Sequence, residues 1–150
     1  MSNQIIEIKI EGLDTARREI ANFPRKIQAT LRDHSVLSQI GTQMALSAKK
    51  TIDAGGRPVA YKPLAESTKA EKLRKYKKES HILVAGGQLR QSLDYEVSGG
   101  QLYLTSQSYL KYHQFEDGRK KANFPARPIW GVQDEDKPEI LDIVITALKK

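Results

Sequence analysis

Residues 35–52 read SVLSQIGTQMALSAKKTI, and this stretch carries the strongest periodic pattern in the chain. Its apolar residues recur at spacings of three and four, which places them on one side of a helix. They are Val36, Leu37, Ile40, Met44, Ala45, Ala48 and Ile52. We therefore predict that Ser35 to Ile52 forms the central core helix. Gly41 costs a helix interior about 1 kcal/mol relative to Ala, which indicates either a close helix crossing or tolerated strain.

On the N-terminal side of this helix, the sequence predicts a strand and then another helix. Residues 5–11 alternate isoleucine with charged residues, and this period of two is typical of a strand with one buried face. Apolar residues between 13 and 23 then recur at helical spacing. Pro24 lacks an amide donor and its ring clashes with the preceding turn, so we expect a break or kink there before the helix resumes.

The middle of the chain, residues 53–85, is predicted to be a mobile excursion. Residues 53–63 include AGGRP and YKP, which hold too many glycines and prolines for a regular element, so we expect a loop. Residues 69–78 then predict a basic helix with too few apolar side chains to lie in the core. Such a segment gains order and burial only on association, and we therefore expect it to contact partners.

Residues 88–130 are predicted to contain a hairpin, with short helical or extended segments before and after it. Paired glycines at 99–100 separate the runs 95–97 and 102–104, which is a hairpin signal. We expect a helical turn at 88–92, and a short helix or extended crossing segment at 108–115. Residues 129–130 are expected to form one more short strand.

The chain closes with a pattern that predicts a good helix. Asp134 to Asp136 can cap it, Pro138 suits its first turn, and Lys149 complements its negative end. Its apolar face is formed by Ile140, Leu141, Val144, Ile145 and Leu148.

Strands segregated from helices favour the α+β class, as a small antiparallel sheet packed by a layer of helices, with a long protruding loop and basic helix. A chain of 150 residues is the size of one domain, so residues 1–150 are predicted to form one. The chain has no cysteine, which excludes disulfides and fits a reducing bacterial cytoplasm. No apolar run approaches the roughly 20 residues that span a bilayer, and residues 1–10 do not read as a signal peptide. We expect a soluble protein without membrane contact.

The net charge of +7 is concentrated in one segment. Residues 49–90 contain 11 Lys or Arg and 4 Asp or Glu, whereas the charges of the two flanks nearly cancel. Such a concentration of positive charge attracts phosphate groups or an acidic protein surface, and salt should screen the attraction. The candidate residues for contact with DNA or an acidic partner are Lys69, Lys72, Arg74, Lys75, Lys77 and Lys78.

The sequence gives no positive sign of catalysis, because G-x-S-x-G, P-loop and H-E-x-x-H patterns do not occur in it. His113, Glu116 and Asp117 lie close together and could in principle bind a metal or act as acid and base. Their spacing matches no established metal motif, so a structural interpretation is favoured and no cofactor is expected. A small metal-dependent nuclease using His113 and Glu116 is the least favoured alternative.

Several short motifs follow one another between about residues 40 and 132. Their positions are Tyr61, Pro63, Leu64, Thr68, Leu83, Gly87, Leu89, Ser92, Tyr109, His113, Gln114, Phe115, Pro125, Ala126 and Arg127. This order resembles the phage virion morphogenesis (tail completion) family of long-tailed bacteriophages. The chain departs from the family pattern in three places. Tyr61 stands where Trp is frequent, Gly86 replaces a Thr, and Glu116 replaces a Gly.

The resemblance implies a small α+β structural protein rather than an enzyme. It implies a role in tail completion or head-tail joining, at the neck or tail end of a virion assembled in the bacterial cytoplasm. The partners it implies are other copies in a ring, and tail tube, tail terminator or head-tail connector proteins. A basic segment repeated around a ring would line a channel for DNA, so non-specific DNA contact is also expected. The alternative function, from charge alone, is a free nucleic-acid-binding protein.

Overall fold

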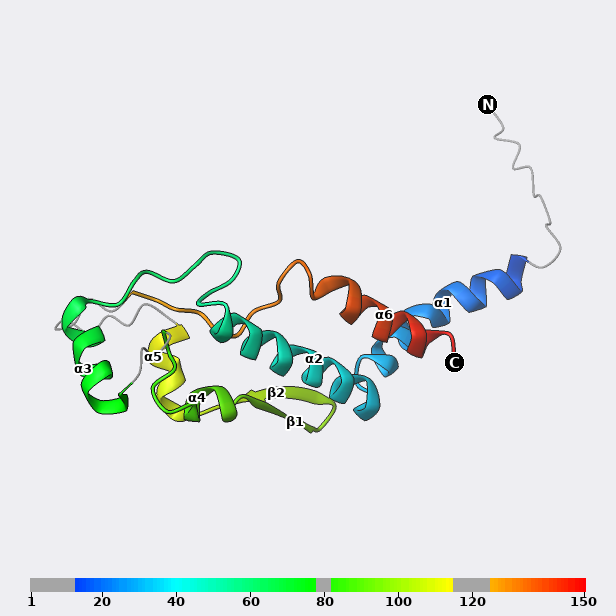
Figure 1. The fold of residues 1–150 in the computed structure, drawn as a ribbon. Helices are drawn as coiled ribbons and strands as arrows, with labels where there is room; N and C mark the ends of the chain where they lie inside the picture. The colour runs from blue at the N-terminus through cyan, green and yellow to red at the C-terminus, as the bar shows by residue number, and fades with distance from the viewer. Residues whose placement is uncertain (1–12, 78–81, 115–124) are drawn as a thin grey trace, which may run out of the picture.

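The computed structural model of the chain describes residues 13–77, 82–114 and 125–150 (Figure 1). The predicted strand at 5–11 lies outside these ranges, as do Lys78 and Phe115. The elements are α1 (Leu13–Thr30), α2 (His34–Asp53), α3 (Glu66–Tyr76), α4 (Gln88–Gln91), β1 (Asp94–Ser98), β2 (Gln101–Thr105), the 3₁₀ turn η1 (Ser108–Leu110), α5 (Lys111–Gln114) and α6 (Lys137–Leu148). A two-stranded antiparallel sheet among several helices confirms the α+β prediction.

The central helix is α2, one residue longer at each end than predicted. The side chain of Asp33 caps it by accepting from the backbone N–H groups of Ser35 and Val36, at 2.9 and 3.1 Å. Such a cap satisfies amides that have no partner inside the helix. Contacts with both strands and with α6 make α2 the helix around which the body is built.

The predicted hairpin is present and packs on α2. Strands β1 and β2 pair antiparallel, and the glycines between them, Gly99 and Gly100, adopt positive φ angles of 58° and 71°. A Cβ at Gly41 would lie 2.5 Å from the ring of Tyr95 and 2.9 Å from Cδ1 of Leu102. The close approach at Gly41 is therefore made to the hairpin, so a helix crossing was the wrong interpretation of this glycine.

The main hydrophobic core lies on the side of α2 that faces α4 and η1. Its buried members are Ala48, Ile52, Leu89, Leu93, Leu110 and Ile129. They come from α2, α4, the chain after α4, η1 and residues 125–133, so this cluster joins segments far apart in sequence. One of its members, Leu89, also lines the pocket that is described below.

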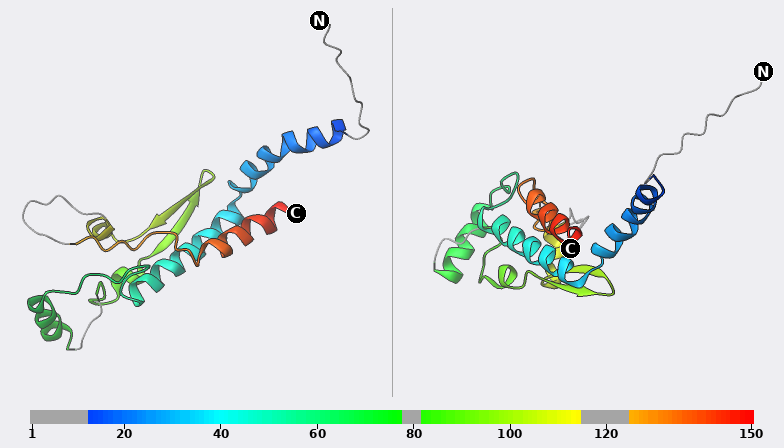
Figure 2. Two further views of the ribbon diagram at one scale, coloured as in Figure 1. Left: turned by 90° about the horizontal axis from the view of Figure 1, so that it is seen from above. Right: turned by 90° about the vertical axis from the view of Figure 1, so that its right-hand side faces the viewer.

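Helix α1 continues through Pro24, so of the predicted break or kink the break is wrong. Proline removes one backbone hydrogen bond from a helix, while the other bonds of this 18-residue helix remain on both sides of it. Figure 2 shows α1 as one ribbon that reaches away from the body.

Helix α6 begins where predicted, but two expectations about it need correction. Asp136 occupies the cap position, yet its carboxylate accepts from Ser47 Oγ and from the N–H of Gln133 and does not cap α6. The predicted apolar face is also only half covered. Leu141 and Ile145 are 58% and 46% exposed, because the contact of α6 with α1 and α2 is narrower than the apolar stripe.

The molecule is elongated, with different elements at its two ends (Figures 1 and 2). Helices α3 and α5 lie at one end, and α1 and α6 lie at the other. Within the described ranges, no helix has the length and apolar character needed to cross a membrane.

Candidate binding site between α3 and α5

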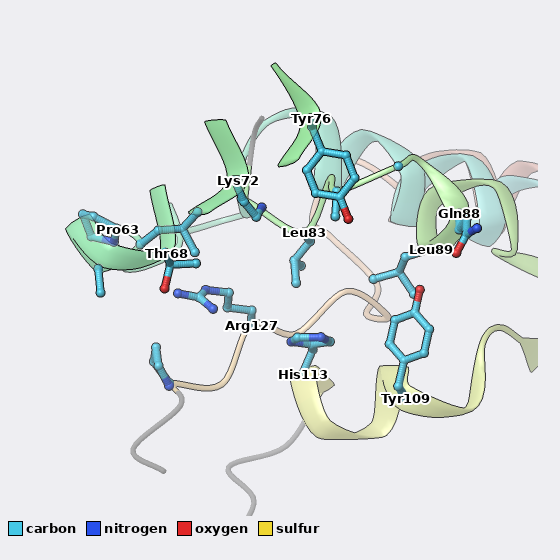
Figure 3. Close-up of a pocket in the computed structure, with 15 residues that line it drawn as sticks. Pro63, Thr68, Lys72, Tyr76, Leu83, Gln88, Leu89, Tyr109, His113 and Arg127 are labelled. Carbon is cyan, nitrogen blue, oxygen red and sulfur yellow. The ribbon is translucent and has the colours of Figure 1, made fainter. Parts of the chain in front are cut away.

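A pocket of about 700 Å³ lies between α3, α4 and α5 (Figure 3). Nine motif positions line it, namely Pro63, Leu64, Thr68, Leu83, Leu89, Tyr109, His113, Pro125 and Arg127. The other lining residues are Ala65, Lys72, Tyr76, Ala85, Gly86 and Gln88. Motifs that the sequence presents one after another are thus brought together around one cavity.

A second hollow, of about 830 Å³, shares Pro63, Leu64 and Lys72 with this pocket. Tyr61 is the only further motif position among its described lining residues, which also include the acids Asp53 and Glu66. Because most motif positions gather in the first pocket, we take that pocket as the candidate site.

One face of α3 forms a wall of the pocket. Thr68, Lys72 and Tyr76 follow one another at a spacing of four, which places them on the same side of a helix. They are the half-buried residues of α3, whereas the remaining residues of this helix are exposed. The basic helix therefore does more than present charge to solvent, since Lys72 faces the cavity together with Tyr76.

The opposite wall comes from η1 and α5. The rings of Tyr109 and His113 make an edge-to-face contact, with centroids 6.4 Å apart and an interplanar angle of 84°. The backbone carbonyl of His113 accepts a hydrogen bond of 2.7 Å from the N–H of Arg127. This bond ties the Pro-Ala-Arg segment to α5.

Arg127 is the polar centre of the site. Only 7% of this residue is exposed, and Figure 3 shows its guanidinium between Thr68 and His113. Its Nη2 donates to the carbonyl oxygen of Lys62 at 3.3 Å, and its buried Nε has no hydrogen-bond partner. Burial lowers the pKa of Arg127, although a guanidinium stays charged at any physiological pH.

The buried positive charge also affects its neighbours. Burial first, and the charge of Arg127 second, lower the pKa of His113 and that of Lys72. Burial raises the pKa of Tyr61 to about 12. Tyr61 therefore stays a neutral phenol, and its hydroxyl donates to the carbonyl oxygen of Pro128 at 2.6 Å. This bond holds the loop after α2 against the segment that carries Arg127.

Gln114 explains why residues 129–130 are not the strand that was predicted. Its Oε1 accepts from the N–H groups of Ile129 and Trp130, at 2.9 and 3.0 Å, and its Nε2 donates to the carbonyl of Trp130 at 2.8 Å. A side-chain amide thus satisfies the backbone groups that a neighbouring strand would otherwise satisfy.

The remaining motif positions support the pocket from outside. Gly87 precedes α4 with a φ of 78°, a conformation that favours glycine. Ser92 Oγ donates to the carbonyl of Leu89 at 2.8 Å and accepts from the N–H of Gln107 at 3.1 Å. Ala126 is half-buried beside Arg127 in the sequence.

The candidate contact residues for DNA or an acidic partner divide into two groups. Lys72 lines the pocket, whereas Arg74, Lys75 and Lys77 are exposed outside it. Lys69 forms an ion pair of 2.7 Å with Glu66. The basic segment therefore offers both a pocket cation and a separate exposed patch.

The candidate metal site at His113 cannot be completed from the described residues, because Glu116 and Asp117 lie outside them. In the part of the chain that the structure describes, no three His, Cys, Asp or Glu side chains gather where they could hold a metal ion. His113 itself lies beside the cation Arg127, which suits an anion better than a second cation.

Sequence reasoning missed the inward face of α3 and the burial of Arg127. The spacing of four between Thr68, Lys72 and Tyr76 was the available signal for the first. Nothing local to Arg127 signals its burial, because the walls around it come from other parts of the chain.

Comparison with known proteins agrees with the motifs. The sequence model of the phage virion morphogenesis family matches residues 15–149. No curated protein and no solved structure gives a significant match. The family match spans nearly the whole chain and includes all the motif positions that meet at the pocket. The chain therefore belongs to the phage virion morphogenesis family.

Proposed function

We propose that this protein is a structural subunit of the phage particle that acts in tail completion or head-tail joining, as one copy in a ring and without a catalytic step. Membership of the family establishes the broader role in phage virion morphogenesis. The finer role is supported by what the two ends of the molecule present.

The observation that carries the proposal is the convergence of the motif positions on one pocket. Its walls combine apolar side chains with a buried cation, which is the composition of a recognition site for part of another molecule. Among the described residues that line the pocket there is no Asp or Glu, and His113 is the one histidine. This composition favours binding over chemistry.

The opposite end presents a different surface. Leu141 and Ile145 of α6, and Phe23 of α1, are exposed there, as is Leu31 just after α1. Exposed apolar side chains that gather on neighbouring elements are typical of interaction sites. A subunit with two different contact surfaces makes heterologous contacts, and such contacts close into rings when the rotation between copies permits it.

The basic patch adds a third element to the proposal. Arg74, Lys75 and Lys77 are exposed at the α3 end, and a ring would repeat them around its axis. A ring of positive charge lining or edging a channel favours the passage of DNA through non-specific contact with phosphates. This supports the proposed position at the neck or tail end of the virion.

The test is electron microscopy of particles produced without this protein. We expect intact heads beside unjoined or wrongly terminated tails. Normally joined particles of normal tail length would overturn the proposal. Purified protein mixed with isolated tails should add a ring at the tail end, and decoration along the tail shaft would contradict the ring.

Association should also increase the protection of residues 53–85. In the free protein, we expect amide hydrogens of this segment to exchange faster than those of α2, and to become protected in assembled particles. Equal protection of the segment and of α2 in the free protein would contradict this part of the proposal.

A second candidate function is a free nucleic-acid-binding protein, which the exposed patch of Arg74, Lys75 and Lys77 favours. It predicts submicromolar binding to duplex DNA that weakens steeply with salt. A gel-shift series at rising salt separates the two, because one structural subunit should bind duplex only weakly.

A further inference from the structure

We propose that the pocket between α3 and α5 binds an acidic side chain carried by an apolar segment of a partner protein, and that Arg127 pairs with its carboxylate. The inference deepens the proposed function, since it states what this pocket takes. It rests on that function only for the source of the segment, which would be a neighbouring protein of the particle.

The first support is the bonding of Arg127. A guanidinium carries five N–H donors, and the described bonds of this one comprise a single donation, from Nη2 to the carbonyl of Lys62. Its Nε is buried and unpartnered. A buried charge is costly unless it is paired and hydrogen-bonded, and the described residues of the site supply no anion that would satisfy it.

The second support is the charge of the pocket. Among the described lining residues there are two basic side chains, Arg127 and Lys72, and no Asp or Glu. The charge of Arg127 contributes to lowering the pKa of Lys72, so the two cations lie close enough to repel each other. An anion bound beside Arg127 would reduce this repulsion.

The third support is the chemistry of the walls. The pocket is lined largely by apolar and aromatic side chains, including Pro63, Leu64, Leu83, Leu89, Pro125, Tyr76 and Tyr109. A cavity of about 700 Å³ holds several side chains but no duplex. A carboxylate is planar and matches the planar fork of N–H donors on a guanidinium. Apolar neighbours of that carboxylate would fill the remaining space.

The exposed basic patch argues against DNA as the occupant of this pocket. Arg74 and Lys75 lie on the same helix as Lys72 but do not line the cavity. A phosphate backbone would engage the exposed patch without entering the site. The pocket and the patch therefore select different partners, one acidic and apolar, the other polyanionic.

The test uses the full-length protein and a small probe, the amide-capped tripeptide acetyl-Leu-Glu-Leu-amide. Its matched control is acetyl-Leu-Gln-Leu-amide, which has the same shape and no charge. Titrations followed by the NMR signal of the Arg127 Nε–H should show saturable binding of the Glu peptide, and at least tenfold weaker binding of the Gln peptide. Equal binding of both peptides would overturn the inference.

Variants then locate the binding, and in these the titration is followed by the backbone amide signals of Thr68, Leu89 and His113, which line the pocket. Arg127→Lys should weaken the Glu peptide at least tenfold, and Lys72→Gln should weaken it severalfold. Lys75→Gln removes the same charge from the exposed side of α3 and should have no effect. Because Arg127 is buried, Lys72→Gln keeps the inference testable if Arg127→Lys does not fold. An equal loss in Lys72→Gln and Lys75→Gln would show general charge attraction and overturn it.

Other occupants give different outcomes. Inorganic phosphate or a short duplex that displaces the Glu peptide at lower concentration would overturn the inference in favour of a phosphate site. The chain's own acids are tested by the variant Glu116→Gln/Asp117→Asn. A shift of the Arg127 Nε–H signal in that variant, without any peptide, would show that the site is filled from within and would also overturn it.

The two proposals fail in distinguishable ways. If the Glu peptide does not bind while particles lacking the protein still show unjoined tails, the pocket inference fails alone. If the peptide binds but particles without the protein are joined normally, the proposed role fails and the pocket chemistry stands.

Discussion

Ser47, in the middle of α2, donates a buried hydrogen bond of 2.5 Å to the carboxylate of Asp136, which immediately precedes α6. Both residues are at most 2% exposed. Arg57 extends this pair into a network. Its Nη2 donates to Ser47 Oγ at 2.7 Å, and its Nη1 forms an ion pair with Glu135. This network fixes the start of α6 and the loop after α2 on the same turn of α2. It thereby sets the path of the segment that carries Arg127 to the pocket.

Replacing Ser47 with Ala should destabilise the protein by about 1–3 kcal/mol, because the buried Asp136 carboxylate loses a donor. The double variant Ser47→Ala/Asp136→Ala should cost less than the sum of the single variants by about 0.5 kcal/mol or more. Urea unfolding measures both. Asp134→Ala, which removes an exposed carboxylate paired with Lys137, serves as control and should change stability by less than about 0.5 kcal/mol. Strict additivity would show that the pair is not coupled.

Gly41→Ala should destabilise the protein although alanine is the better helix former. The gain in propensity is about 1 kcal/mol, whereas forcing the ring of Tyr95 away should cost about 1–3 kcal/mol. The ring cannot yield cheaply, because its hydroxyl lies 3.0 Å from Thr42 Oγ1 in a hydrogen bond. Gly86→Ala is the matched control, since a Cβ there meets nothing within 4 Å. Thermal unfolding of the two variants should differ clearly, and a more stable Gly41→Ala would refute the tight contact.

Gln114→Leu should loosen residues 125–133, because the backbone groups of Ile129 and Trp130 lose three hydrogen bonds with a side chain. Gln114→Glu keeps both acceptor contacts but turns a carboxylate oxygen toward the Trp130 carbonyl, so the two amides should stay better protected than in Gln114→Leu although the carbonyl is repelled. Trp130 is the sole tryptophan and reports on the segment by its fluorescence. Hydrogen exchange at the amides of Ile129 and Trp130 should accelerate most in Gln114→Leu. Unchanged exchange at these amides would show that the hydrogen bonds of Gln114 do not hold residues 129 and 130 in place.

The stability of the protein should depend on His113 as pH falls. Burial and Arg127 lower its pKa from the usual 6.5 in the folded protein, so the unfolded chain binds more protons below that value. The contribution is complete above pH 6.5 and is lost as pH falls toward the folded pKa. The melting temperature should therefore drop between about pH 7.5 and pH 5.5 by more in the parent than in His113→Gln. Parallel profiles for the two proteins would contradict a depressed pKa.

Several elements were predictable because their signals lie between residues that are neighbours in the chain. The stripe from Val36 to Ile52 predicts α2 nearly to the residue, since helix formation follows from side chains three and four positions apart. The glycine pair at 99–100 predicts the hairpin, because the positive φ of a tight turn is a local requirement. The motif order likewise anticipated the family that the match over residues 15–149 establishes.

Elsewhere local patterns misled. Apolar residues at 129–130 suggested a strand, but the partner of their backbone is the side chain of Gln114, fifteen residues away. The apolar stripe of α6 suggested a buried face, yet the width of its contact with α1 and α2 leaves Leu141 and Ile145 exposed. The spacing of apolar residues in the sequence indicates which side of a helix is apolar. The neighbouring elements determine how much of that side is covered.

Residue order alone thus specified the main helices, the hairpin, the basic segment and the family, because each depends on spacing along the chain. The pocket, the buried and unpartnered guanidinium of Arg127, and the close approach at Gly41 arise only in the folded molecule. Burial and hydrogen-bond partners depend on residues that come from distant segments. The charge of Arg127 is desolvated, and its Nε left without a partner, only after those segments have packed around it.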